Sequence, residues 1–222
     1  MDHYKTKTQL AYERLRDAIL AGEYQPGSGI VADQVAAELG VSKVPIREAI
    51  TRLVGQGWLE LRPHVGAVVP ELSPEGVLDI ALLRGAVESA ALWHAAPLHD
   101  VVSLAELDTL LDEMDKLLSE DSPRYPILNA QFHVALIEPC PHRQMREMGQ
   151  TLIQQAQRFR PIRFLPMYAP DAQSEHRAIV EAIKARQFAR ASQSTRRHIE
   201  DAGVLLHKYA IESLAHNAVI RA

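Results

Sequence analysis

Apolar residues recur every three or four positions over most of the chain, the spacing that places them on one face of an α-helix. Three such stretches open the sequence. Two short apolar runs follow them, interrupted by a turn that contains Pro63 and Gly66. The pattern therefore predicts three helices and then a β-hairpin. The predicted helices are 9–21, 32–39 and 43–55, and the predicted strands are 58–61 and 67–69.

From residue 74 onward only the helical spacing continues, in stretches separated by breaks that are mostly marked by proline. Ser73 and Pro74 predict the start of the first of these helices, because serine caps helix N-termini and proline is tolerated at the first helical position. The short connections favour an antiparallel bundle. The predicted helices are 74–95, 101–119, 125–138, 143–160, 171–186 and 188–215.

These elements predict a mainly α protein with two domains, and 222 residues are enough for both. The first domain, 1–70, is predicted to be an N-terminal winged helix-turn-helix, built from three helices plus a β-hairpin wing. Residues 71–74 are the predicted linker. The second domain, 75–222, is predicted to be an all-α antiparallel helical bundle.

Composition changes the picture in three ways. The longest apolar stretch, 81–98, contains Arg84, Glu88 and His94 and is too polar for a membrane span, and the N-terminus has no signal-peptide core. The single cysteine, Cys140, cannot form an internal disulfide, so we expect a cytoplasmic protein with no membrane partner. The net charge is −4, so any affinity for DNA must come from a local arrangement of basic residues.

A tight turn at 40–42, followed by a helix that opens with basic residues, indicates a helix-turn-helix. In this motif the second helix lies in the major groove, and its first residues reach base edges. Lys43 and Arg47 share one helix face, and an arginine there can contact guanine through two hydrogen bonds. The alternative is a solvated helix face or a module that binds protein. The candidate DNA-binding residues are Ser42, Lys43, Val44, Pro45, Arg47, Arg52, Arg62, His64 and Gly66.

Several separated motifs in this half resemble the GntR family of regulators, and they occur in the family's order. They are the segments 19–22, 25–27, 39–50, 57–59 and 64–66. The resemblance covers residues from about 8 to 70 and implies DNA binding by a winged helix-turn-helix. The family commonly has arginine where this chain has Lys43. Lysine contacts phosphate or guanine without the two-pronged geometry of arginine.

Four polar residues of the second domain have a spacing that indicates a metal site. Asn129 and His133 are four positions apart on one predicted helix face. His176 and His198 each lie 11 positions from Gln187, where two helices join, so an antiparallel hairpin would place both imidazoles at the same height. Three imidazoles and an amide oxygen suit Zn²⁺, Ni²⁺ or a similar divalent ion. The alternative is that these are hydrogen-bonded core histidines or unrelated surface residues.

The second domain resembles the FCD-type effector domain of the FadR branch of GntR regulators. The resemblance rests on Arg84 with Glu88 and on the segments 129–133, 175–183 and 197–198. It implies an all-helical bundle in which an Asp, sometimes an Asn, and three His hold a metal, with small carboxylates bound at or beside it. Aspartate is commoner where this chain has an asparagine, so the site has one negative charge fewer. The matching metal-binding positions are Asn129, His133, His176 and His198.

Arg84 is the candidate effector-binding residue, because a guanidinium fits a carboxylate through two hydrogen bonds. An ion pair with Glu88, one helical turn away, is the alternative for this arginine. The segment 139–142 departs from the family's usual small residue and asparagine after the helix that bears the metal-binding histidine.

Together the resemblances imply a ligand-responsive transcriptional repressor that is not an enzyme. We expect it to bind a palindromic operator as a homodimer and to be released or modulated by a small organic acid. One alternative is a metal-dependent hydrolytic enzyme that uses the three histidines, although no general base is evident, since Glu175 and His176 are adjacent on a helix and point apart. The other is a protein-interaction module whose helix-turn-helix does not bind DNA.

Overall fold

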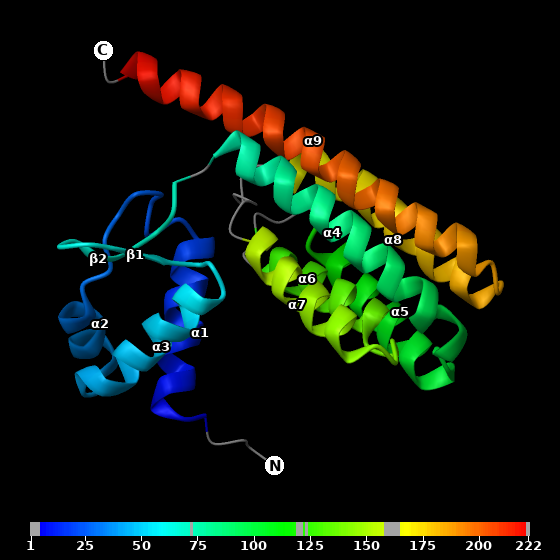
Figure 1. Cartoon of the computed structure of the whole chain (residues 1–222), viewed down its shortest axis with the longest axis horizontal. Coiled ribbons are helices and arrows are strands. Elements are labelled where there is room, and N and C mark those ends of the chain that lie inside the picture. Colours follow the sequence, from blue (N-terminus) through cyan, green and yellow to red (C-terminus); the bar gives the residue numbers. More distant parts are fainter. Residues whose placement is uncertain (1–4, 72, 119–121, 123, 158–164, 221–222) are drawn as a thin grey trace. The chain divides into compact units, whose positions relative to one another are not determined.

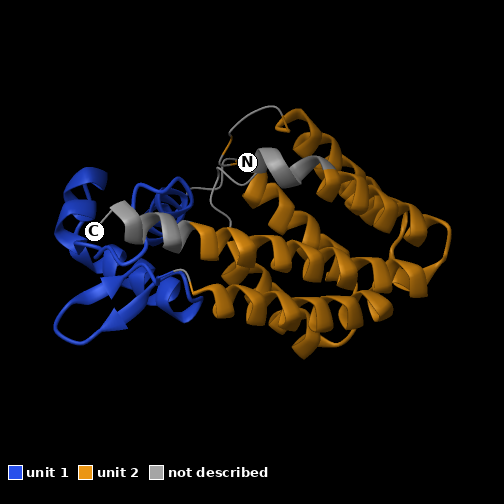
Figure 2. Ribbon diagram, turned by 90° about the horizontal axis from the view of Figure 1, so that it is seen from above, with its two compact units in different colours: residues 1–71 blue, residues 72–222 orange. Residues whose placement is uncertain are grey.

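The computed structural model describes residues 5–71, 73–118, 122, 124–157 and 165–220 (Figure 1). The chain forms two compact units, Met1–Glu71 and Leu72–Ala222 (Figure 2). Each unit encloses its own buried apolar side chains. Among the described residues, no helix is both long enough and apolar enough to cross a membrane.

The first unit contains three helices and a β-hairpin. They are α1 (Lys7–Leu20), α2 (Ala32–Leu39), α3 (Lys43–Gly55), β1 (Glu60–Arg62) and β2 (Gly66–Val68). Helices α1 and α2 both pack on α3, and the two strands pair antiparallel with Leu61 opposite Ala67. Leu15, Ile46 and Trp58 are almost fully buried in this unit. The predicted winged helix-turn-helix is confirmed.

The hairpin begins later than the sequence predicts. Gly57 has a φ of 75°, and the backbone N–H of Trp58 donates to the carbonyl oxygen of Leu53 at 2.9 Å. Trp58 therefore closes the end of α3, and its ring is buried with Leu59. The prediction of a strand from residue 58 was wrong because these apolar residues pack under the helix end, and β1 starts at Glu60.

A left-handed glycine separates α2 from α3. Gly40 has a φ of 62°, and the backbone N–H of Val41 donates to the carbonyl oxygen of Ala36 at 3.0 Å. This geometry ends α2 and lets α3 start three residues later. Ser42 occupies the N-cap position of α3 with an extended backbone, but its side chain makes no capping hydrogen bond. Its hydroxyl is left exposed at the start of α3.

The second unit is an all-α bundle, as predicted. Its helices are α4 (Pro74–Ala95), a 3₁₀ helix (Ala96–Leu98), α5 (Val101–Lys116), α6 (Arg124–Ile137), α7 (Arg143–Gln157), α8 (Leu165–Lys184) and α9 (Phe188–Ile220). Helices α4 and α9 run side by side (Figure 1), α7 packs on α4, and α8 packs on α9. Phe132, Leu107 and Tyr125 are among the largest buried side chains of its core.

Two hydrogen bonds show that α4 and α9 run in opposite directions. The hydroxyl of Ser192 donates to the carbonyl oxygen of Ser89 at 2.8 Å, and His207 Nδ1 donates to the carbonyl oxygen of Pro74, also at 2.8 Å. A Cβ atom added to Gly203 of α9 would lie 2.2 Å from the Cβ of Ala81. The two backbones therefore approach as closely as only glycine allows here.

Some helix ends differ from the predicted ones. Helix α8 starts at Leu165 instead of residue 171, because Pro166 lies in its first turn, where proline costs no hydrogen bond, and Pro170 removes only one. Helix α9 continues to Ile220 instead of residue 215. The predicted helix ends at 119 and 158–160, and Leu72 of the predicted linker, lie outside the described residues. The predicted cap of α4 is confirmed, since Ser73 Oγ accepts from the Gly76 N–H at 3.2 Å.

Candidate functional site

The first turns of α3 present polar and apolar side chains to solvent. Ile46, Ala49 and Leu53 bury one face of this helix against the rest of the unit. The opposite face is exposed at Arg47 and Val44, and Val44 is 63% exposed. The predicted DNA-binding residues Ser42 and Lys43 are also exposed, and Pro45 is half-buried. The start of α3 can therefore meet a large flat partner without rearrangement of the core.

The basic residues of this face differ in how they are held. Lys43 Nζ lies 2.8 Å from Asp33 Oδ2 on α2, and both side chains are exposed. The guanidinium of Arg47 forms no ion pair with any residue that the structure describes, and it lines an open hollow together with Val44 and Arg52. An arginine without an internal partner can donate both of its forked N–H groups to a guanine.

The remaining predicted DNA contacts have other partners. The guanidinium of Arg52 lies 4.0 Å from the ring centroid of Tyr12 and donates to Gln9 Oε1 at 2.9 Å, so it is held on α1. Arg62 Nε donates to Glu60 Oε1 within the hairpin at 2.7 Å. A DNA role for both arginines stays a prediction. His64 and Gly66 have positive φ angles of 62° and 100°, and both are exposed where the hairpin turns.

Three buried histidines from α6, α8 and α9 converge in the second unit. His133, His176 and His198 are each at most 1% exposed. One ring nitrogen from each lies within 4.8 Å of those of the others, and the Nε2 atoms of His176 and His198 are 3.0 Å apart. The structure thus brings together the three histidines that the spacing singled out.

Each of these rings has an oxygen acceptor close to its Nδ1 atom. His176 Nδ1 lies 3.0 Å from Gln173 Oε1, His198 Nδ1 lies 2.6 Å from Glu175 Oε2, and His133 Nδ1 lies 2.9 Å from Glu88 Oε2. An oxygen acceptor favours the tautomer that carries its proton on Nδ1. The lone pairs on Nε2 are then directed into the cluster, which is how histidine binds metal ions.

The amide of Gln173 is oriented by its own partners. Its Nε2 donates to the carbonyl oxygen of Leu111 at 3.0 Å and to Asp115 Oδ1 at 2.8 Å. Because both amide protons are used on α5, Oε1 is the atom that faces His176. This fixes the direction of the hydrogen bond, with the imidazole as donor.

Asn129 supplies an unused acceptor one turn before His133 on α6. Its side chain is 4% exposed, and Oδ1 has no hydrogen-bond partner among the described residues. His133 Nε2 likewise has none, and burial lowers the pKa of His133 to about 4, so the ring is neutral at pH 7. Buried acceptors without donors are costly unless a cation or a donor fills the space between them. Three imidazole nitrogens and one amide oxygen fit a divalent transition metal.

Arg84 and Glu88 extend the cluster towards α4. Arg84 Nε donates to Glu88 Oε1 at 2.6 Å, and both side chains are buried. Burial raises the pKa of the Glu88 carboxyl, but the nearby Arg84 and His133 offset this effect and leave its pKa below the usual value. The ion pair considered as the alternative for Arg84 is therefore present. Arg84 Nη2 still has no hydrogen-bond partner among the described residues, so one donor remains for a ligand.

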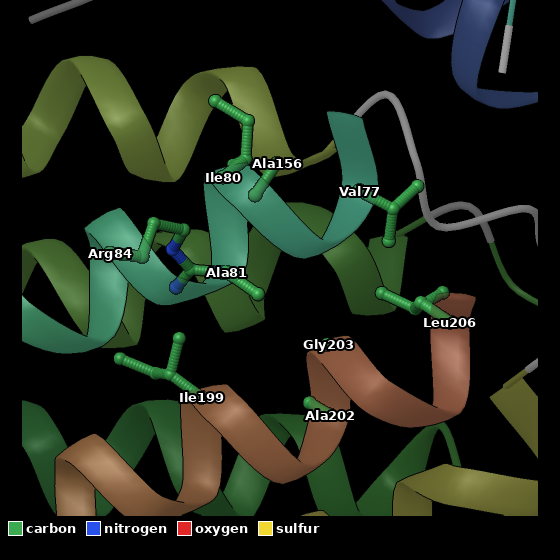
Figure 3. Close-up of a pocket in the computed structure, with 9 residues that line it drawn as sticks. All are labelled: Val77, Ile80, Ala81, Arg84, Ala156, Ile199, Ala202, Gly203 and Leu206. Carbon is green, nitrogen blue, oxygen red and sulfur yellow. The ribbon is translucent and has the colours of Figure 1, made fainter. Parts of the chain in front are cut away.

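A small pocket with a volume of about 10 Å³, partly open to solvent, lies between α4 and α9 at Arg84 (Figure 3). Its other walls are apolar and include Val77, Ala81, Ala202 and Leu206. Figure 3 shows Arg84 and Ala81 on α4, and Ala202 on the facing helix α9. The charged residue thus connects this pocket through Glu88 to the histidine cluster.

Sequence reasoning missed the partners that orient the rings. Gln173 is three positions before His176, a spacing that would have indicated a contact on one helix face. Glu175 was judged only against its neighbour His176, whereas its partner is His198 on the next helix. Glu88 was considered only as a partner of Arg84, and no local spacing links it to His133.

The fold and these sites define a class of protein, the helix-turn-helix regulators that carry a separate helical sensing domain. Residues 7–69 match the family described as bacterial regulatory proteins, gntR family, and residues 79–201 match the FCD domain. The chain belongs to the GntR family of DNA-binding transcriptional regulators and carries an FCD domain. Membership indicates a regulator rather than an enzyme.

Relatives and solved structures agree with this assignment. The chain is 25% identical to the HTH-type transcriptional repressor GlaR of Escherichia coli K12 over 85% of this chain and 90% of that protein. It is 31% identical to an uncharacterised HTH-type regulator of Streptomyces ambofaciens over 62% of this chain, a match that spans 58% of that regulator. The structure of E. coli McbR/YncC shares the fold, with a TM-score of 0.79 at 21% identity over 92% of this chain and 99% of that one.

Proposed function

We propose that this regulator is a repressor that binds a palindromic operator as a homodimer and is released when a small carboxylate binds beside a metal ion in its helical unit. The observation that carries the proposal is the set of three buried imidazoles, which have ring nitrogens within 4.8 Å of one another and an oxygen close to each Nδ1. We assign DNA reading to residues 1–70, the connection to 71–74, and sensing and dimerisation to 75–222.

DNA reading rests on the exposed start of α3. Arg47 is the residue we expect to read a guanine, because its guanidinium has no internal ion pair within the described structure. Ser42 and Lys43 are expected to bind phosphate beside it, and His64 and Gly66 would place the hairpin against the backbone. Several relatives, including GlaR and the gluconate operon repressor of Bacillus subtilis, are named as repressors, which favours repression here.

His133, His176, His198 and Asn129 would hold the metal, with Zn²⁺ and Ni²⁺ as the ions that best suit this donor set. A bound ion would supply positive charge and open coordination positions for a carboxylate oxygen. The unused Nη2 of Arg84 would orient that carboxylate from the side of α4. The chain of contacts Arg84–Glu88–His133 then couples the ligand to α4 and α6.

Helix α4 begins at Pro74, the last residue of the segment 71–74, so a shift of α4 reaches the DNA-reading unit through the backbone. A coupling free energy of about 1–3 kcal/mol suffices to change DNA affinity roughly 5- to 150-fold. The repressor therefore needs only a modest preference of the effector for one arrangement of α4.

Two measurements test this function. Selection from random double-stranded DNA at near-physiological salt is expected to enrich a short inverted repeat, since non-specific binding weakens steeply with salt. Elemental analysis of the purified protein, together with the His176→Ala variant, is expected to find a divalent metal that the variant loses. Absence of any enriched sequence would overturn DNA reading. Equal metal content in both proteins would overturn the assigned ligands.

A further inference from the structure

Asp33 is an exposed acidic residue at the start of the helix-turn-helix. It lies in the first turn of α2, and its Oδ2 atom is 2.8 Å from Nζ of Lys43 in the first turn of α3. The two side chains are 64% and 56% exposed. Because the first residues of the second helix reach base edges in this motif, the Asp33 carboxylate lies beside the DNA-reading surface.

Stability of the fold does not account for a carboxylate at this place. An exposed ion pair contributes little, because water screens the charges and both side chains lose freedom. Asp33 also interacts favourably with the dipole of α2, but that effect does not depend on the neighbouring helix. On a surface that binds a polyanion, an added negative charge weakens binding unless it meets a positive group or a hydrogen-bond donor. The carboxylate therefore requires a partner in the complex with DNA.

Other exposed carboxylates of these two helices are held by α1. Glu38, at the other end of α2, accepts from Arg14 Nε at 2.7 Å, and Glu48 of α3 accepts from Thr8 Oγ1 at 2.7 Å. Arg14 and Thr8 both belong to α1. Asp33 differs from them, since a residue of the DNA-reading turn itself holds it.

The pair of Asp33 and Lys43 has unused hydrogen-bonding capacity on both sides. The ammonium group carries three protons, and one of them is donated to Asp33. The other two protons can bind the phosphate that the proposed function assigns to Lys43. Within the described part of the first unit, Asp33 Oδ1 accepts no hydrogen bond. Lys43 thus neutralises the carboxylate near the phosphates, while Oδ1 can accept from a base.

A carboxylate only accepts hydrogen bonds, and this property selects among the bases. In the major groove cytosine N4 and adenine N6 are donors, whereas guanine O6 and thymine O4 are acceptors. Adenine N6 has acceptors on both sides, its own N7 and the O4 of the paired thymine, and these repel the second carboxylate oxygen. Cytosine N4 has an acceptor on one side only, the O6 of the paired guanine. Cytosine is therefore the base that best fits an aspartate.

We infer that Asp33 is a specificity-determining residue, which accepts a hydrogen bond from N4 of a cytosine in the major groove while Lys43 binds a phosphate beside it. The inference rests on the DNA reading of the proposed function and adds a second base contact to the guanine assigned to Arg47. Each half of the inverted repeat then contains one base pair that α2 reads and one that α3 reads.

Selection from random double-stranded DNA with the wild type and with Asp33→Ala tests this contact. The variant is expected to enrich the same inverted repeat, except that one cytosine in each half is no longer preferred. Glu38→Ala removes the same charge from the same helix, so it is the matched control and is expected to keep that cytosine. Unchanged preferences in Asp33→Ala, or relaxation at a base other than cytosine, would overturn the inference. Absence of an enriched repeat with the wild type would instead overturn DNA reading itself.

Fluorescence anisotropy on the selected operator measures the size of the effect. Replacing the cytosine of one half by thymine turns the amino donor into an acceptor and is expected to weaken wild-type binding roughly 10-fold or more. Asp33→Ala is expected to bind the two duplexes within roughly 2-fold of each other. Asp33→Asn is expected to tolerate either base, because an amide both donates and accepts. A full wild-type preference for cytosine in Asp33→Ala would show that another residue reads this base and would overturn the inference.

Discussion

The start of α3 and the histidine cluster between α6, α8 and α9 differ most in exposure, since Val44 is 63% exposed whereas His133 and His176 are 0% exposed. They also differ in how their polar groups are held. Arg47 has no ion-pair partner in the described structure, while each histidine of the cluster has an oxygen at Nδ1. A surface that reads DNA gains from side chains that can adjust to a base, whereas a site for a small ion gains from rings that are fixed beforehand.

Replacing His176 with alanine is the change with the largest expected effect. It removes one of three imidazoles, so the affinity for Zn²⁺ should fall by more than roughly 100-fold. Loss of a residue that only orients a metal ligand costs less, about 10- to 100-fold. Competition with a chromophoric chelator measures this. His142→Ala, at an exposed histidine, is the control and should bind Zn²⁺ like the wild type. A single half of the inverted repeat tests DNA reading by one subunit. If His176→Ala lowered the affinity for this DNA as strongly as for Zn²⁺, the start of α3 would depend on the histidine cluster.

Arg47→Ala comes next and acts on the exposed region alone. Loss of a two-pronged contact to guanine should cost about 1–3 kcal/mol, which weakens binding to the selected operator roughly 5- to 150-fold. The operator affinity of Arg47→Lys should lie between those of the wild type and Arg47→Ala, because lysine keeps the positive charge but cannot make the two-pronged contact. Fluorescence anisotropy measures the affinity for the operator and for a scrambled duplex. The comparison separates a loss of base reading from a loss of phosphate binding. An equal loss on both duplexes would show that Arg47 binds phosphate and reads no base.

Glu175→Ala probes the orientation of the rings within the buried region. Without the acceptor at Nδ1, His198 loses its fixed tautomer, and affinity for Zn²⁺ should fall about 10- to 100-fold. Glu175→Gln retains an acceptor oxygen and should lose less. Glu181→Ala, one exposed carboxylate further along α8, serves as the control. Unchanged Zn²⁺ affinity in Glu175→Ala would mean that the ring needs no such support.

The smallest expected effect is on the stability of the helical unit in acid, and it comes from His99, a histidine outside the cluster. Burial lowers the pKa of His99, although its hydrogen bond to the carbonyl oxygen of Leu136 partly opposes this. Between the lowered folded value and the unfolded value of about 6.5, the unfolded chain takes up the proton first, so stability falls as pH drops through this range. His99→Gln should show a smaller decrease in Tm between about pH 7 and pH 5. An identical decrease would assign the acid sensitivity to other groups.

The sequence predicts the parts of both regions that depend on local spacing. The equal distances of His176 and His198 from Gln187 place the two rings together, and the structure has their Nε2 atoms 3.0 Å apart. The three helices and hairpin of the first unit also follow from local patterns. Helix periodicity carries such information because residues three and four apart share a face.

Contacts between distant segments could not be predicted in this way. The approach of Glu88 on α4 to His133 on α6 depends on how the helices pack, as does the reach of Glu175 to His198. The strand predicted from Trp58 was wrong for a related reason, since that apolar residue is buried under the end of α3. Apolar character alone does not say which neighbour covers a residue.

The histidine cluster has one more consequence because α6, α8 and α9 each contribute a single ring. An ion bound there would tie together three segments that the unfolded chain keeps apart, much as a cross-link does. By mass action, any ligand that binds only the folded chain raises its melting temperature with concentration. Under the proposed function, the supply of metal in the cell would then set how long each molecule survives degradation, in addition to what it senses.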